Sequence, residues 1–167
     1  MTAHRLLLIR HAKTEQGSPD VQRALTDRGR RDARALGEWL RANEHIPGHV
    51  VVSQAVRAKQ TWRFAAEGAS AQVPVSVDDR IYSNDVDGLV EVVRTLPESA
   101  EVAALVGHNP SMQELAAAWT PATEASYGVD PHRDFPTATV AVFTVDGEWG
   151  DADATTLRPI AIETLRG

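Results

Sequence analysis

The chain contains no cysteine among its 167 residues. Disulfide bonds, thiolate nucleophiles and cysteine-based zinc sites are therefore excluded, and this composition suits a reducing compartment. No apolar run approaches the roughly 20 residues that a helix needs to span a bilayer, and the apolar run near the start is too short for a secretory signal peptide. We therefore expect a cytoplasmic protein with no membrane partner.

An excess of basic residues is also lacking. Lysine and arginine number 17 against 23 acidic residues, for a formal net charge of −6. General nucleic-acid binders need a basic face that displaces counterions, so we expect no nucleic-acid partner. Any phosphate-bearing ligand must instead meet a local cluster of cations. The length suits one hydrophobic core, which predicts a single domain over residues 1–167.

Short apolar runs alternate along the chain with stretches of helical periodicity. Strands are expected at 6–9, 50–52, 73–77, 102–106, 137–145 and 154–157. Helices are expected from Thr26 to about Asn43 and over 55–68, 86–96 and 110–119. This alternation indicates a mostly parallel sheet that is covered by helices on both faces. The segment 121–136 has little periodicity, and we interpret it as a functional flap or a flexible insertion.

Histidine and arginine side chains follow three of the expected strands. Arg10 and His11 come directly after the first strand, Arg57 shortly after the second, and His108 after the fourth. Ligands of open parallel sheets bind beyond the carboxyl ends of the strands. We therefore expect these four side chains to meet at one edge of the sheet.

Phosphoryl transfer is the chemistry that suits this set of residues. A phosphoryl group in transfer spreads negative charge over three oxygens, which the protein must position and stabilise. Arginine offers two parallel N–H donors to phosphate, and histidine supplies either a nucleophilic nitrogen or a donor. Nearby arginines would lower the pKa of His11 and keep its ring neutral. Each residue alone has an ordinary structural explanation, so the prediction depends on their coincidence.

Five segments of the chain resemble the histidine phosphatase superfamily and, within it, the SixA-like phosphohistidine phosphatases. In chain order they are Leu8–Thr14, Arg23–Gly29, Ser53–Thr61, Asp79–Tyr82 and Val106–Pro110. The resemblance implies a three-layer α/β/α sandwich with a mostly parallel central sheet, of the phosphoglycerate mutase-like type. It also implies that His11 is the nucleophile and becomes phosphohistidine. The other implied contacts to the phosphoryl group are Arg10, Arg57 and His108, with Arg23 and Thr14 as further substrate-binding residues.

The chain departs from this family at the general acid. Many members carry a glutamate at the position of Ser83, and the nearest carboxylate here belongs to Asp85, which is the candidate acid. An alcohol leaving group needs a proton, whereas phosphohistidine loses an imidazole with a reference pKa of about 6.5. A weak or missing acid therefore favours phosphohistidine as the substrate.

These observations lead to one main functional expectation and two alternatives. We expect a metal-independent phosphatase, with no cofactor, that forms a covalent phosphohistidine and acts on protein phosphohistidine. The first alternative is a phosphatase for small phosphomonoesters. The second is a non-catalytic phosphate-binding module, which the replacement of the acid by Ser83 would suit.

Overall fold

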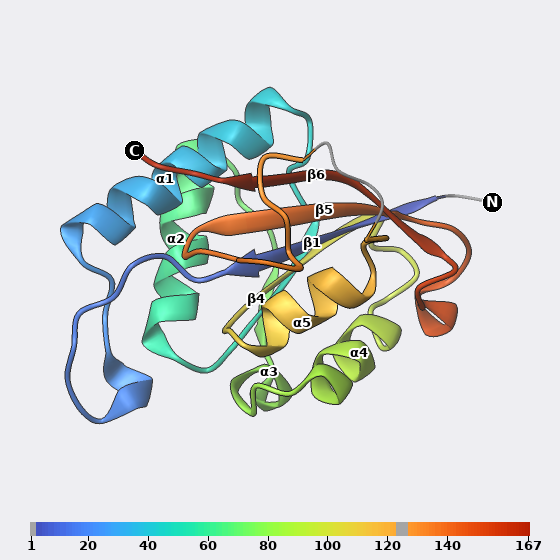
Figure 1. Cartoon of the computed structure of the whole chain (residues 1–167). Coiled ribbons are helices and arrows are strands. Elements are labelled where there is room, and N and C mark those ends of the chain that lie inside the picture. Colours follow the sequence, from blue (N-terminus) through green and yellow to red (C-terminus); the bar gives the residue numbers. More distant parts are fainter. Residues whose placement is uncertain (1–2, 123–126) are drawn as a thin grey trace.

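A computed structural model describes residues 3–122 and 127–167 of the chain (Figure 1). The strands are β1 (His4–Arg10), β2 (His49–Val52), β3 (Val75–Val77), β4 (Val102–Gly107), β5 (Thr139–Val145) and β6 (Leu157–Thr164). The helices are α1 (Asp27–Ala42), α2 (Val56–Ala69), α3 (Asp79–Tyr82), α4 (Val86–Arg94) and α5 (Ser111–Ala118). Two single-turn 3₁₀ helices cover Asp20–Gln22 and Trp149–Asp151. No helix in the described ranges has the length and apolar character needed to cross a membrane.

All six strands form one sheet in the order β3-β2-β4-β1-β5-β6. The first four strands in this order run parallel to one another. On the far side of β1, β5 pairs antiparallel with β1, and β6 pairs antiparallel with β5. The sheet is therefore mixed and mostly parallel. This arrangement confirms the expected fold class.

The central strand β1 supplies side chains to both faces of the sheet. Successive strand residues point to opposite faces, so Leu6 and Leu8 belong to one apolar cluster and Leu7 and Ile9 to the other. All four side chains are fully buried. Burial on both faces explains why this strand reads as a continuous apolar run rather than an alternating one.

Helices cover both of these faces and complete three layers (Figure 1). Leu36 of α1 and Trp62 of α2 pack on the face that carries Leu7 and Ile9. Leu89 of α4 and Leu115 of α5 pack on the opposite face. The expected α/β/α sandwich is confirmed.

The expected elements agree closely with the observed ones, with differences in two places. The strand expected at 154–157 is wrong, because the chain turns there and β6 runs over Leu157–Thr164. Edge strands tolerate proline and exposed charge, and Pro159 beside the charged Arg158 made this strand hard to predict from the sequence. The short helix α3 was not expected, and Asp78 caps it by accepting a hydrogen bond from the Arg80 amide. Within the segment 121–136, residues 123–126 lie outside the described residues.

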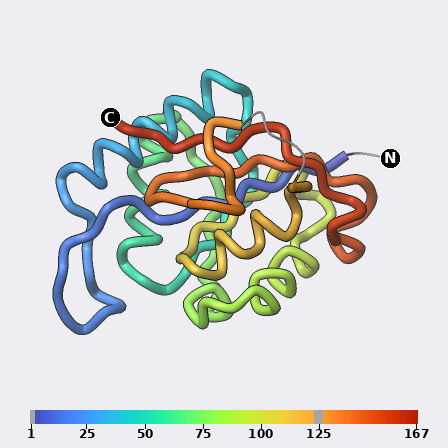
Figure 2. The backbone as a smooth tube through the Cα atoms, viewed as in Figure 1, coloured from blue at the N-terminus to red at the C-terminus, as the bar shows by residue number. Residues whose placement is uncertain are grey.

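The parallel register brings the expected site residues to one edge. Arg10 at the end of β1 pairs with Gly107 at the end of β4, and Val52 at the end of β2 pairs with Val106. The residues that leave these three strands are therefore neighbours. Figure 2 shows that the chain between β1 and α1 extends beyond this edge.

Candidate active site

A polar cavity of about 370 Å³ lies beyond the carboxyl ends of β1, β2 and β4. Its lining residues are Arg10, His11, Lys13, Thr14, Gln16, Arg23, Arg57, Asn84, His108, Asn109 and Thr137. Four of these carry a positive charge, and none of the described lining residues is a carboxylate. A larger hollow of about 580 Å³ between α2 and β3 is mainly apolar and contains no histidine. The chemistry expected from the sequence therefore belongs to the smaller cavity.

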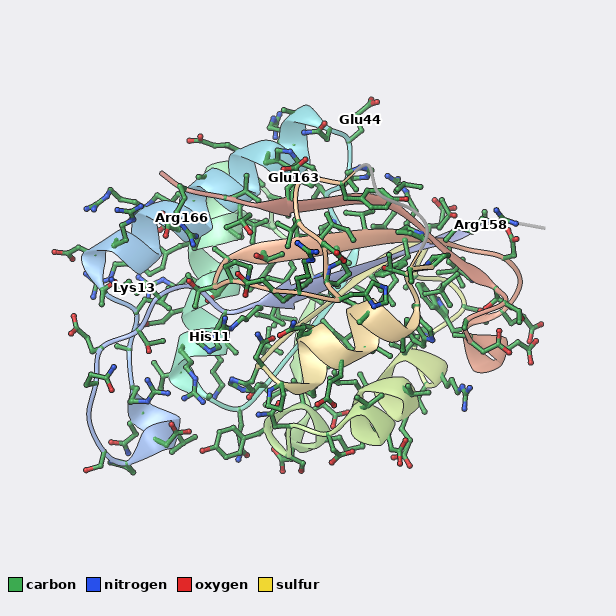
Figure 3. The ribbon with its side chains drawn as sticks, viewed as in Figure 1. His11, Lys13, Glu44, Arg158, Glu163 and Arg166 are labelled. Atoms are coloured by element: carbon green, nitrogen blue, oxygen red, sulfur yellow. The ribbon has the colours of Figure 1, made fainter. Side chains whose placement is uncertain are left out.

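His11 lies at the exit of β1, and Figure 3 shows it beside α2 with Lys13 further along the loop. The ring is buried, and its Nδ1 lies 2.7 Å from the carbonyl oxygen of Ala12. Because a carbonyl can only accept, Nδ1 carries the proton and Nε2 keeps its lone pair. Burial lowers the pKa of His11 to about 3; the hydrogen bond to Ala12 opposes this, and the positive charges of Arg57 and Arg10 add to it. His11 is thus a neutral imidazole with one nitrogen available as a nucleophile.

A buried threonine fixes the carbonyl that orients His11. The Ala12 amide donates to the Thr61 Oγ1 at 2.9 Å, and the Thr61 hydroxyl donates to the Arg57 carbonyl oxygen at 2.7 Å. Both Ala12 and Thr61 are fully buried. The second turn of α2 therefore holds the backbone next to the candidate nucleophile.

His108 lies across the cavity from His11, with 5.3 Å between the ring centroids. Its Nε2 lies 2.8 Å from the Ser53 hydroxyl oxygen, which also accepts a hydrogen bond from the Ala55 amide. Burial lowers the pKa of His108 to about 4, and Arg57 adds to this effect. The buried Nδ1 has no protein partner within the described part of the chain. It is therefore a buried polar atom that faces the cavity residues without a hydrogen bond to the described protein.

Arg10 is held by a segment that is distant in sequence. Its Nη1 donates to the carbonyl oxygen of Phe135 at 3.0 Å, and the side-chain amide of Asn109 donates to the same oxygen at 3.0 Å. Burial lowers the pKa of Arg10 from its very high ordinary value, and the nearby Asp134 carboxylate opposes this shift. The buried Nε of Arg10 has no hydrogen-bond partner among the residues that the structure describes.

Arg57 comes from the first turn of α2 and is almost fully buried. Its Nη1 donates to the Asp20 carbonyl oxygen at 2.9 Å, and its Nη2 donates to the Asp20 carboxylate at 3.0 Å. Arg23 also donates to this carboxylate, at 3.1 Å, and to the Thr14 hydroxyl at 2.7 Å. Asp20 was not among the residues expected from the sequence.

The structure brings together most of the residues that the sequence singled out. Six of them line the cavity: Arg10, His11, Thr14, Arg23, Arg57 and His108. Asp85 does not line it, because its carboxylate accepts a hydrogen bond from the Gly88 amide at 2.7 Å and caps α4. The roles of all seven stay predictions.

Asn84, next to Asp85, lines the cavity instead. It adopts the left-handed backbone conformation, with φ of +62°. Its side chain donates to the Asn109 carbonyl oxygen at 2.8 Å and accepts from the Ser111 amide at 3.1 Å. These bonds support the turn that follows β4, which carries His108.

The donor set of this cavity suits an oxyanion. Arginine donates hydrogen bonds to phosphate oxygens, and so does a histidine ring nitrogen that carries a proton; three buried nitrogens of Arg10, Arg57 and His108 have no hydrogen-bond partner within the described ranges. No cluster of three or more metal-binding side chains occurs among the described residues. A phosphoryl-sized anion would provide acceptors for the three free nitrogens.

Comparison with known sequences gives one family. The model of the histidine phosphatase superfamily (branch 1) matches residues 6–85. The uncharacterized protein Rv1276c of Mycobacterium tuberculosis is 34% identical over 149 residues, which cover 87% of this chain and 92% of that protein. The uncharacterized protein ML1117 of Mycobacterium leprae is 28% identical, covering 95% of this chain and 100% of that protein.

Solved structures with the same architecture agree with this family. One is described as the "Putative Phosphohistidine Phosphatase SixA from Nakamurella multipartitia"; it is 28% identical, has a TM-score of 0.83, and the match covers 98% of this chain and 96% of that chain. The protein histidine phosphatase SixA complexed with tungstate has the same fold, with a TM-score of 0.76, 20% identity and 96% coverage of both chains. Because the sequence model, the fold and the residues of this site agree, the chain belongs to the histidine phosphatase superfamily. It is a hydrolase of the histidine phosphatase type, and its structure resembles SixA.

Proposed function

We propose that this protein is a metal-independent phosphatase that forms a covalent phosphohistidine on His11 and acts on protein phosphohistidine. One observation carries the proposal: His11 is held neutral, with the proton on Nδ1, in a cavity that it shares with Arg10, Arg57 and His108. Such a ring is a nucleophile that needs no separate base. The surrounding cations stabilise the charge of the transferring group without a metal ion.

The first step transfers the phosphoryl group to the protein. Nε2 of His11 attacks phosphorus and forms a P–N bond, while the bond from phosphorus to the leaving nitrogen breaks in line and its electron pair goes to that nitrogen. The substrate ring carries a proton on its other nitrogen, so it leaves as neutral imidazole. Arg10, Arg57 and His108 bind the equatorial oxygens. The proton stays on Nδ1 of His11, where the Ala12 carbonyl oxygen accepts its hydrogen bond and stabilises the positive charge on the ring.

The second step returns the protein to its starting state. A water molecule attacks phosphorus, the P–Nε2 bond breaks, and inorganic phosphate leaves. The electron pair of that bond returns to Nε2 as its lone pair. One proton from the water goes to the phosphate or the solvent, so His11 ends neutral.

The position of Ser83 and the surroundings of Asp85 support phosphohistidine over alkyl phosphates. Ser83 stands where many relatives carry an acid, and the carboxylate of Asp85 is bonded to the Gly88 amide. A departing imidazole needs less help from an acid than an alkoxide, because its reference pKa is about 6.5. The SixA structures with this fold are described as histidine or phosphohistidine phosphatases.

We also propose that residues 1–167 form one domain that works in the cytoplasm.

Trapping the phosphorylated protein tests the mechanism. After brief mixing with a phosphohistidine peptide and quenching in base, we expect acid-labile, base-stable phosphate on His11, located by mass spectrometry. The variant His11→Ala should carry none and should not turn over, yet still bind vanadate. Wild-type turnover by His11→Ala would refute the mechanism, and a protein that only binds phosphate would carry no label.

Two further measurements test the substrate and the metal independence. We expect higher kcat/KM for phosphohistidine peptides than for sugar phosphates; the reverse order would favour small phosphomonoesters, for which the cavity of about 370 Å³ has room. We expect activity to survive a strong chelator. A large loss that added metal restores would contradict metal independence.

A further inference from the structure

The carboxylate of Asp20 accepts hydrogen bonds from three chain segments that surround the cavity. Its oxygens accept hydrogen bonds from Arg57 Nη2 at 3.0 Å, from Arg23 Nε at 3.1 Å and from the Tyr82 hydroxyl at 2.7 Å. Arg57 belongs to α2, Tyr82 to α3, and Arg23 to the chain between β1 and α1. Bonds between a carboxylate and a guanidinium are shorter and stronger than neutral ones.

Asp20 itself does not line the cavity, although both of its arginine partners do. Its side chain is 52% exposed, whereas that of Arg57 is only 7% exposed. The aspartate therefore contacts the outer side of the guanidinium. It approaches from solvent and leaves the inner side of Arg57 to a ligand.

The bonds to Asp20 determine how Arg57 is oriented. One terminal nitrogen is bound by the Asp20 carbonyl oxygen and the other by its carboxylate. The remaining nitrogen, Nε, is buried and has no acceptor among the described residues. Because a guanidinium is planar, holding its two terminal nitrogens also fixes the direction of the Nε–H bond.

We propose that Asp20 is a positioning residue, which aligns the guanidinium of Arg57 with the phosphoryl group in the transition state. This inference rests on the proposed function, in which Arg57 binds the transferring oxygens. Asp20 acts through Arg57 and does not touch the substrate. Hydrogen bonds from Tyr82, Arg57 and Arg23 hold the pKa of Asp20 at about 2, so its carboxylate is ionised and has no proton to donate.

The conservative change Asp20→Asn separates alignment from simple attraction. It removes one negative charge beside the cationic cavity, so inorganic phosphate should bind as well as before or more tightly. It also replaces a charged acceptor with a neutral amide and loosens Arg57. Small misplacements of a catalytic group cost up to about a hundredfold in rate, so we expect kcat to fall on the order of tenfold to a hundredfold.

Two readouts test the proposal in the full-length protein. The first is the ¹⁵N spectrum of the Arg57 guanidinium, whose two terminal groups should give separate signals in the wild type and merged signals in Asp20→Asn. The second is a comparison of kcat and of the dissociation constant for inorganic phosphate between the wild type and Asp20→Asn. An unchanged Arg57 spectrum, an unchanged kcat, or a loss of phosphate affinity as large as the loss in kcat would overturn the proposal.

Two further variants distinguish an effect that acts through Asp20 from a general effect of removing a surface interaction. Tyr82→Phe removes one hydrogen bond to Asp20 without changing charge, and its kcat should fall by roughly twofold to tenfold, the equivalent of one hydrogen bond. Asp27→Asn makes the same change in a surface Asp–Arg pair on α1, in which Asp27 lies 3.0 Å from Arg30 and both side chains are exposed. Its kcat and the Arg57 spectrum should match the wild type. If the wild type forms no phosphohistidine, the proposed function fails, while the Arg57 spectrum still decides whether Asp20 orients that side chain.

Discussion

Replacing Thr61 with valine should damage both the stability and the activity of the protein. The hydroxyl of Thr61 is the only acceptor that the structure gives the Ala12 amide within its described ranges, at 2.9 Å, and both residues are fully buried. Valine has the same shape but offers no acceptor. The amide next to the candidate nucleophile is then left unpaired in the interior.

The size of the effect follows from that unpaired amide. A buried donor without a partner costs about 1–3 kcal/mol, and the added methyl group returns less than about 1 kcal/mol. We therefore expect a net loss of about 2 kcal/mol in the free energy of unfolding. For a chain of this length this corresponds to a fall in Tm of about 4–8 °C.

Thermal unfolding and steady-state kinetics measure the two consequences together. The Ala12 carbonyl, which orients His11, belongs to the same short backbone segment, so kcat should fall in the fraction that remains folded. Thr61→Ser keeps the hydroxyl and is the matched control, with kcat near that of the wild type. A valine variant with the Tm and kcat of the serine variant would refute the reasoning.

Three other predictions concern His108, its hydroxyl partner and the packing behind the site. Ser53→Ala removes the hydroxyl 2.8 Å from His108 Nε2 and should lower kcat on the order of tenfold, measured by steady-state kinetics; it also removes the acceptor of the buried Ala55 amide, so Tm should fall as well. The pKa of His108 is lowered to about 4, below the ordinary value of about 6.5, so the unfolded chain takes up its proton first and stability falls as pH drops through this interval. Urea midpoints at pH 7 and pH 5 should therefore differ more for the wild type than for His108→Gln. An equal difference in the two proteins would contradict a lowered pKa of His108 as the cause. Gly29→Ala would place a methyl group against the Lys13 carbonyl oxygen at the start of α1; it should lower both Tm and phosphate affinity, whereas unchanged values would show that the loop yields freely.

The convergence of the site was predictable because it depends on strand direction. Each of Arg10, His11 and His108 follows a short apolar run, and the carboxyl ends of parallel strands share an edge. The α1 boundary was also predictable, since the Thr26 hydroxyl accepts a hydrogen bond from the Gly29 amide in the expected way. These features depend on local sequence and on general rules of sheet topology.

The supporting hydrogen bonds were not predictable in the same way. Asp20, Ser53 and Thr61 act through partners 37, 55 and 49 residues away in the chain. A short polar side chain in a loop or helix gives no sign of such a partner. Asp85 did offer a local sign, because an aspartate directly before a helix commonly caps it, and this explains its distance from the cavity.

The bond between Arg10 and the Phe135 carbonyl oxygen has a consequence for how the protein matures. The last residue with a role in the proposed chemistry is His108, yet the acceptor that holds Arg10 and the strand β5 beside β1 are made later. A nascent chain that ends before β5 leaves β1 at an open edge of the sheet and leaves Arg10 without this acceptor. We therefore expect phosphatase activity to appear only after Phe135 and β5 have left the ribosome.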